Sequence, residues 1–263
     1  AVLRVVGRSD KEKRGKGNIL TLMGATDRSV LLIGKENVEK LSRASVALFG
    51  VGGVGGFAAE ALVRSGVGEI TVFDNDTIAE SNLNRQIIST AENIGEDKTE
   101  AIRKRLLSIN PALKFTAHKE FYLPETADKY DLSVFDCVLD AVDTVAAKIE
   151  IISRAKAAGV PVISCMGTGG KTDPTRLKVA DITKTTECPL ARVMRRELKK
   201  RGITGVKVVY SDEPTVKDEA AMQNAERVKC GRPSPPSMIF VPATAGLILA
   251  REAVFGIINR DNK

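Results

Sequence analysis

This sequence of 263 residues has no tryptophan, a single histidine and an aromatic content of only 4%. With so few rings, stacking platforms for nucleic-acid bases are scarce. Any nucleic acid would therefore be held mainly through its phosphates and through a pocket for one nucleoside. The single histidine, His118, falls near the end of a predicted strand, where we expect a structural role.

Cysteine is also sparse, and no two cysteines form a C-x-x-C pair; the four are Cys137, Cys165, Cys188 and Cys230. Structural zinc sites commonly use such pairs, so we expect no zinc. Because nothing indicates an oxidising compartment, we expect no disulfides, and Cys230 is interpreted as a surface thiol.

Long hydrophobic runs are missing as well. A membrane-spanning helix needs about 20 mainly apolar residues, and the longest candidate, residues 238–258, contains Arg251 and Glu252. We interpret that stretch as a buried helix and expect no membrane span. Charged residues near the start interrupt any signal-peptide core, so we expect a cytoplasmic protein.

Apolar segments of strand length alternate with helical patterns, which predicts a Rossmann-like α/β fold with a mainly parallel sheet and helices on both faces. Two C-terminal strands extend the sheet. The predicted strands are residues 45–49, 69–73, 113–117, 137–141, 160–164, 177–182 and 206–211. The predicted helices are residues 31–41, 55–65, 98–108, 145–158, 189–201 and 242–259. We expect a basic tail over residues 1–25, a single domain over 26–263 and a loop over 212–237.

A glycine-rich turn follows the strand at residues 45–49, with the spacing Gly50-x-Gly52-x-x-Gly55 and a further Gly53. Glycines let the backbone approach a phosphate, and the N-terminus of the following helix favours negative charge. Asp74 ends the next strand, where an acidic residue can bind ribose hydroxyls. These residues alone suit a redox dinucleotide as well as ATP.

The polar loop that follows Asp74 favours ATP. It carries Asn82 and Arg85, and Lys98 begins the next helix. Cations and amide donors aimed at phosphates stabilise the charge that develops when a carboxylate attacks the α-phosphate of ATP. Asp143 follows a strand and could hold Mg²⁺. Each residue also has an ordinary interpretation as a cap or surface charge, but their order favours nucleotide chemistry.

Three segments carry a resemblance to a known group of proteins. "GVGGVGGFAAEALVRSGVGEITVFDNDTIAESNLNRQ", "GEDKTE" and "DAVDT" resemble the ThiF/MoeB/HesA superfamily of adenylating enzymes, from about residue 28 to the last helix. "MGTGGKTDPTRLKVADITKTTECPLARVMRRELKKRGI" resembles the branch that dehydrates threonylcarbamoyladenosine in tRNA. The resemblance implies that ATP adenylates the carboxylate of that modification, which then cyclises with loss of AMP.

The resemblance also assigns roles to residues. It implies phosphate binding by Gly50, Gly52, Gly53 and Gly55, ribose binding by Asp74, phosphate contacts by Asn82 and Arg85, catalysis by Lys98 and a Mg²⁺ site at Asp143. Arg28 matches an arginine that related dimers insert into the partner's site. We therefore expect a homodimer, with a sulfur-relay protein as a further candidate partner.

A basic helix points towards tRNA. The net charge of the chain is +7, and one side of the predicted helix at 189–201 carries Arg192, Arg195, Arg196, Lys199, Lys200 and Arg201. Such a face can follow an RNA backbone, although a solvated charged face is the ordinary alternative. The alternative functions are adenylation of a ubiquitin-like sulfur carrier, which the missing zinc cysteines disfavour, an NAD-dependent oxidoreductase and a non-enzymatic RNA-binding protein.

Overall fold

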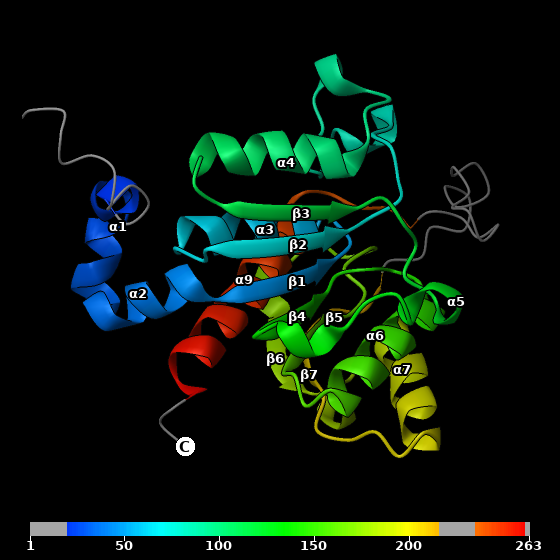
Figure 1. The fold of residues 1–263 in the computed structure, drawn as a ribbon. Coiled ribbons are helices and arrows are strands. Elements are labelled where there is room, and N and C mark those ends of the chain that lie inside the picture. The colour runs from blue at the N-terminus through cyan, green and yellow to red at the C-terminus, as the bar shows by residue number, and fades with distance from the viewer. Residues whose placement is uncertain (1–19, 216–234, 261–263) are drawn as a thin grey trace, which may run out of the picture.

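A seven-stranded sheet forms the centre of the computed structural model, which describes residues 20–215 and 235–260. The strand order is β3-β2-β1-β4-β5-β7-β6 (Figure 1). The strands are β1 (Ser45–Phe49), β2 (Glu69–Phe73), β3 (Lys114–His118), β4 (Cys137–Asp140), β5 (Val162–Cys165), β6 (Leu177–Asp181) and β7 (Lys207–Ser211). Neighbouring strands are parallel except β6 and β7, which pair antiparallel. The predicted Rossmann-like class is confirmed.

Helices cover both faces of this sheet. One face packs against α2 (Lys35–Arg43), α3 (Gly55–Arg64), α4 (Lys98–Ile109) and α9 (Phe240–Ile258). The other packs against α5 (Pro124–Ala127), α6 (Val145–Ala157) and α7 (Pro189–Lys200). Successive residues of a strand point to opposite faces. Accordingly, Val46 and Leu48 of β1 lie in the first core, and Ala47 and Phe49 lie in the second.

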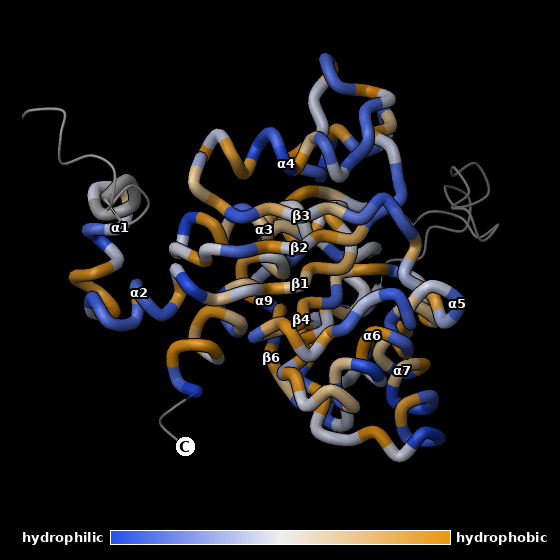
Figure 2. Tube along the Cα trace, in the orientation of Figure 1, coloured by the Kyte–Doolittle hydropathy of each residue, from blue (hydrophilic) through white to orange (hydrophobic). Residues whose placement is uncertain are grey.

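Burial on both faces explains the composition of the strands. A strand covered on both sides is apolar throughout, because alternating polar residues would have to be buried. The last four residues of β1 and of β2 are all buried. Figure 2 shows hydrophobic residues gathered along these central strands. The sheet therefore supplies a rigid support, and polar side chains follow the ends of its strands.

The N-terminal helix differs from the prediction. Instead of one helix over 31–41, α1 (Leu20–Ile33) and α2 are separated by Gly34, whose φ is +82°. Glycine adopts this left-handed conformation without the penalty that a side chain incurs, so the chain turns there. Helix α1 begins within the segment expected to be a tail, and residues 1–19 lie outside the described residues.

Several other predicted boundaries are wrong by one or two residues, among them the starts of β5, β3 and α9. Strand β5 was predicted to begin at Val160, but Val160 still closes helix α6: its N–H donates to Ala155 O at 2.9 Å, next to Gly159 with φ +69°. This is the usual glycine ending of a helix. Strand β3 begins at Lys114, one residue later than predicted, because the Leu113 N–H donates to Asn110 O in a turn. Helix α9 begins at Phe240, two residues before its predicted start at Pro242.

The last helix packs closely on the sheet and on α3. A Cβ atom at Gly246 would lie only 2.3 Å from the carbonyl oxygen of Val54. Helix α9 is long and apolar enough to cross a membrane by length and composition, and 56% of its most apolar window is buried inside the protein. A core helix of a folded domain has the same features, and ten of its residues are buried here.

Candidate functional site

The strand order places a topological switch point between β1 and β4, and we call the region at the carboxyl ends of these two strands the crevice. From β1 the chain proceeds to β2 and β3 on one side, whereas β4 and β5 lie on the other side. Loops that leave neighbouring strands in opposite directions open a crevice, which is where ligands bind in such sheets. The glycine turn follows β1, and Asp143 follows β4. The structure therefore brings both predicted features to one place.

Two glycines of the turn are required by the backbone itself. Gly50 has φ +84°, and a Cβ there would lie 2.9 Å from the carbonyl oxygen of Ala141. A Cβ at Gly55 would lie 1.8 Å from the carbonyl oxygen of Gly50. Neither position can carry a side chain in this conformation. Gly52 and Gly53 are different, since their nearest atoms lie at 3.8 Å (Gln86 Nε2) and 3.4 Å (Pro242 Cβ).

Asp74 connects the glycine turn to the loop after β2. Its Oδ2 accepts a hydrogen bond from the Val51 N–H at 2.8 Å, and its Oδ1 accepts one from the Asp76 N–H at 2.9 Å. Burial raises the pKa of this carboxyl, and the nearby positive charge of Lys98 opposes the rise. A carboxylate has about four acceptor positions, so these two bonds leave capacity for hydroxyl donors.

Lys98 is buried beside this aspartate rather than placed on a wet helix face. Only 6% of the residue is exposed. Its Nζ lies 3.1 Å from Asp76 Oδ2, and its backbone N–H donates to the Asp76 carbonyl at 3.0 Å. Lys98 is also the first residue of α4. The ammonium group is therefore held close to Asp74 and Asp76, at the edge of the crevice.

The loop with Asn82 and Arg85 lies against the glycine turn. The Arg85 Cγ is 3.6 Å from the position of a Cβ on Gly53. The Arg85 guanidinium donates to the Ser81 carbonyl at 2.7 Å and to Asn84 Oδ1 at 3.0 Å. Asn82 is buried, and its Oδ1 accepts from the Ala79 N–H at 3.1 Å. The loop is therefore fixed by its own hydrogen bonds.

Gln86 is a candidate that the sequence analysis did not single out. It is 7% exposed, and within residues 20–215 and 235–260 its buried Oε1 has no hydrogen-bond partner. Buried polar atoms almost always have partners, so an unpaired one beside the turn suits a ligand donor or water. Its position next to Arg85 in the polar loop was the available signal. The sequence also did not indicate the hydrogen bond that Asn84 Nδ2 donates to the Ser237 carbonyl at 2.9 Å.

Asp143 is exposed in the loop after β4, and its Oδ1 accepts from Thr144 Oγ1 at 3.3 Å. In the described part of the chain, no group of three His, Cys, Asp or Glu side chains could hold a metal ion. Mg²⁺ bound with a nucleotide uses only one or two carboxylates together with phosphate oxygens and waters. A single exposed carboxylate at the crevice suits that arrangement.

Arg28 is not brought to the crevice within one chain. It is exposed on α1. Figure 1 shows α1 at the amino-end side of the strands, whereas the glycine turn follows the carboxyl end of β1. Cys230 and residues 216–234 of the expected loop lie outside the described residues. The other predicted site residues come from the loops or helix starts that follow β1, β2 and β4.

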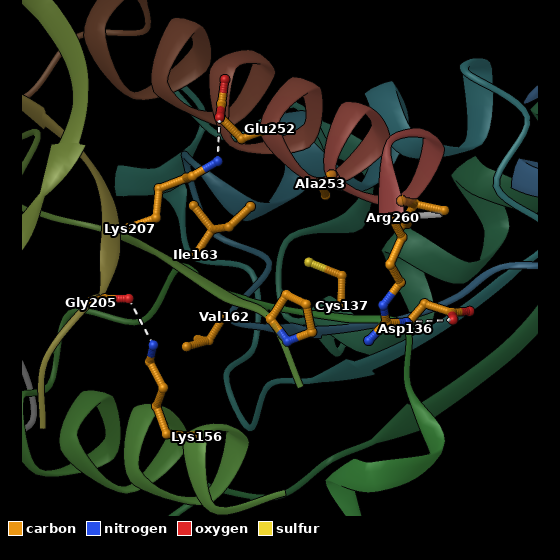
Figure 3. A pocket seen from close by; sticks show the side chains of 13 residues that line it. Asp136, Cys137, Lys156, Val162, Ile163, Gly205, Lys207, Glu252, Ala253 and Arg260 are labelled. Carbon is orange, nitrogen blue, oxygen red and sulfur yellow. Dashed lines mark hydrogen bonds and ion pairs between the residues drawn. The ribbon is translucent and has the colours of Figure 1, made fainter. Parts of the chain in front are cut away.

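A pocket of about 250 Å³ lies at the opposite ends of the strands (Figure 3). It is lined by residues that precede or begin β4, β5 and β7, and by the last turns of α9. Its cations already have partners: Lys156 donates to Gly205 O at 2.7 Å, Lys207 to Glu252 at 2.9 Å and Arg260 to Asp136 at 3.2 Å. None of the predicted site residues lines it.

Comparison with known proteins places these features in context. The model of the ThiF family matches residues 26–263. A Bacillus subtilis protein named tRNA threonylcarbamoyladenosine dehydratase is 42% identical over 238 residues, covering 88% of this chain and 93% of that protein. The Escherichia coli protein of the same name is 35% identical over 193 residues, covering 70% and 72%. The crystal structure of E. coli TcdA in complex with ATP matches with a TM-score of 0.82 and 30% identity, over 92% of this chain and 97% of that chain.

Proposed function

The chain belongs to the ThiF family, and from this premise we propose that it is an ATP-dependent tRNA threonylcarbamoyladenosine dehydratase. The observation that carries the proposal is the meeting of the glycine turn, Asp74 and the Asn82–Arg85 loop at one crevice, in a fold shared with an ATP-bound enzyme of that name. The alternative, activation of a ubiquitin-like sulfur carrier, is not favoured, because the relatives that cover most of the chain bear the dehydratase name.

The proposed reaction has two steps. A carboxylate oxygen of the threonylcarbamoyl group attacks the α-phosphorus of ATP, and pyrophosphate leaves with the electrons of the broken P–O bond. A nucleophile within the same side chain then attacks the activated carbonyl, and AMP leaves. The net change is loss of one water from the nucleoside. An intramolecular nucleophile has a high effective concentration, so no covalent enzyme intermediate is needed.

The residues of the crevice suit these steps. The backbone of the glycine turn and the start of α3 receive the phosphates, because unpaired N–H groups at a helix N-terminus favour anions. Asp74 keeps acceptor capacity for the ribose hydroxyls. Arg85 and Asn82 would face the phosphates from the loop, and the buried ammonium of Lys98 would stabilise negative charge as pyrophosphate leaves.

Asp143 would hold Mg²⁺ together with phosphate oxygens. When bound, Mg²⁺ neutralises phosphate charge and keeps the leaving group oriented. The exposed position of Asp143 at the crevice supports this assignment. An Asp143→Asn variant is expected to need more Mg²⁺ for half-maximal rate while it remains folded.

A second copy of the chain would complete the site. Arg28 lies away from the crevice of its own chain, so in our proposal it acts in the partner's site of a homodimer. The exposed Leu31 and Leu32 on the same helix, 89% and 83% exposed, support contact with another copy. We keep a sulfur-relay protein as a candidate partner and a cytoplasmic location as part of the proposal.

In this proposal, helix α7 binds the part of the tRNA backbone that leads away from the crevice. It starts near the carboxyl end of β5, where Leu190 Cβ is 3.6 Å from the position of a Cβ on Gly167. Not every cation of its basic face is available. Arg195 donates to the carbonyl of Thr185, and Glu197 pairs with Arg196, Lys200 and Arg201. Exposed ion pairs are weak, so RNA phosphates can replace Glu197.

The proposal is tested with purified protein, ATP, Mg²⁺ and tRNA that carries threonylcarbamoyladenosine. AMP and pyrophosphate should form in equal amounts, and only with the modified tRNA. The matched control is the same tRNA without the modification. AMP formation driven instead by a carrier protein would contradict the proposal.

A further inference from the structure

A lysine and an aspartate are completely buried directly behind the candidate site. Lys148 lies in the first turn of α6, and Asp140 is the last residue of β4. Both side chains are 0% exposed, and Lys148 Nζ lies 3.0 Å from Asp140 Oδ2. Charged side chains are almost never fully buried unless they are paired, so the burial of Lys148 and Asp140 depends on their ion pair.

The ammonium group bonds to three acceptors from two strands. Besides Asp140 Oδ2, it donates to the Cys165 carbonyl at 2.6 Å and to Ser164 Oγ at 3.3 Å. The Ser164 hydroxyl donates in turn to Asp140 Oδ2 at 2.5 Å. An ammonium has three donors, and each has an acceptor here. We call Lys148, Asp140, Ser164 and the Cys165 carbonyl the buried clamp.

The buried clamp is connected to the loop that carries Asp143. The second carboxylate oxygen of Asp140, Oδ1, accepts from the Val142 N–H at 3.2 Å. The carbonyl oxygen of Ala141 lies against Gly50, where a Cβ would be 2.9 Å away. The conformation of residues 141–144 therefore depends on Asp140 on one side and on the glycine turn on the other.

Stability alone does not explain such a pair. Desolvation of two charges is so costly that replacing a buried ion pair by apolar residues is often neutral or stabilising. What a fully bonded buried network supplies is rigidity, because each member has one geometry in which all bonds are made. Here the rigid point lies where β4, β5 and α6 meet at the carboxyl edge.

We propose that Lys148 is a positioning residue: through Asp140 it fixes the 141–144 loop so that the Asp143 carboxylate faces the phosphates of the nucleotide. The inference rests on the proposed adenylation for its kinetic consequence. Its structural consequence, a loop held by the buried clamp, does not depend on which reaction the protein performs.

The test compares Lys148→Met with the double variant Asp140→Asn/Lys148→Met. The single variant leaves the Asp140 charge buried without its partner and should melt well below the wild type. The double variant removes both charges and should recover most of that melting temperature. The matched control is Lys156→Met, the same substitution on the same helix, where the ammonium belongs to an exposed residue and donates to the Gly205 carbonyl.

Two measurements distinguish positioning from folding. Amide hydrogen exchange of residues 141–144 in the double variant should be about ten-fold faster than in the wild type, with the strands unchanged. The kcat should fall by about 10- to 100-fold with little change in the KM for ATP, and the Mg²⁺ requirement should rise. Lys156→Met should change neither.

Unchanged exchange at 141–144 in the folded double variant would overturn the inference, and so would a wild-type kcat and Mg²⁺ requirement. If the double variant does not fold, Ser164→Ala replaces it, because it removes one hydroxyl of the buried clamp, and the same exchange result is expected. A wild-type protein that forms no AMP with modified tRNA would refute the proposed function instead, and the exchange comparison would still decide the role of Lys148.

Discussion

Replacing Gly52 by alanine should weaken ATP binding strongly without harming the fold. Gly52 has no positive φ, and a Cβ there would meet nothing nearer than Gln86 Nε2 at 3.8 Å. Alanine can therefore adopt the native conformation, and such a change typically adds about 0.4–1 kcal/mol of stability. The new methyl would, however, stand in the crevice where we place the phosphates.

The expected loss of affinity follows from the hydrogen bonds that the methyl would block. A hydrogen bond to a charged group contributes about 1.5–3 kcal/mol, so losing one bond near the top of that range, about 2.7 kcal/mol, would raise the Kd for ATP by roughly 100-fold. At an ATP concentration of about 100 times the wild-type Kd, binding stabilises the wild type by ~2.7 kcal/mol. A chain of this size gains about 2–4 °C in Tm per kcal/mol, which gives roughly 5–11 °C.

In Gly52→Ala the same ATP concentration would only equal the Kd, so the stabilisation falls to about 0.4 kcal/mol and the shift to about 1 °C. The assay is thermal melting with and without ATP. Gly55→Ala is the matched control for the fold, because its Cβ would lie 1.8 Å from the Gly50 carbonyl oxygen and must lower the Tm without ATP. A full ATP-dependent shift in Gly52→Ala would refute phosphate binding by the turn.

Three further predictions concern the loop, the basic helix and the tyrosines. Arg85→Ala should abolish AMP formation at an almost unchanged Tm; near-normal turnover would remove Arg85 from the site. Neutralising three cations of α7 should weaken tRNA binding and reduce the slope of log K against log salt by up to about 0.9 per lost phosphate contact; identical binding would mean that the face is only solvated. The three cations are Arg192, Arg196 and Lys199. Arg195 is left unchanged because its guanidinium donates to the Thr185 carbonyl. Burial raises the pKa of Tyr122 and of Tyr130 to about 12. Unfolded tyrosines lose their protons near pH 10, so stability should fall as pH rises from about 10 to about 12, and ultraviolet titration showing all tyrosines ionised at pH 10 would contradict this.

The central strands could be predicted from the sequence because burial on both faces leaves no ambiguity in their composition. Both β1 and β2 begin and end where predicted, with glycine or aspartate directly after the apolar run. Boundaries failed where a turn continued a neighbouring element, as at Val160, whose N–H closes α6. The break at Gly34 was missed because a glycine inside a helical pattern does not reveal its φ.

The candidate site was predictable as far as it depends on strand ends. Carboxyl ends of parallel strands share one edge, so Gly50, Asp74 and Asp143 were expected together. The buried clamp was not predictable, because Lys148 and Ser164 meet only through the register of β4 with β5 and the packing of α6. Contacts such as Asn84 with the Ser237 carbonyl, 153 residues apart, likewise depend on the folded chain.

The most direct test of the proposed function is nucleoside mass spectrometry of threonylcarbamoyl-modified tRNA after incubation with the protein, ATP and Mg²⁺. The modified nucleoside should lose the mass of one water, only when ATP is present, with one AMP formed for each nucleoside converted. An unchanged nucleoside mass, with the protein folded and ATP bound, would contradict it.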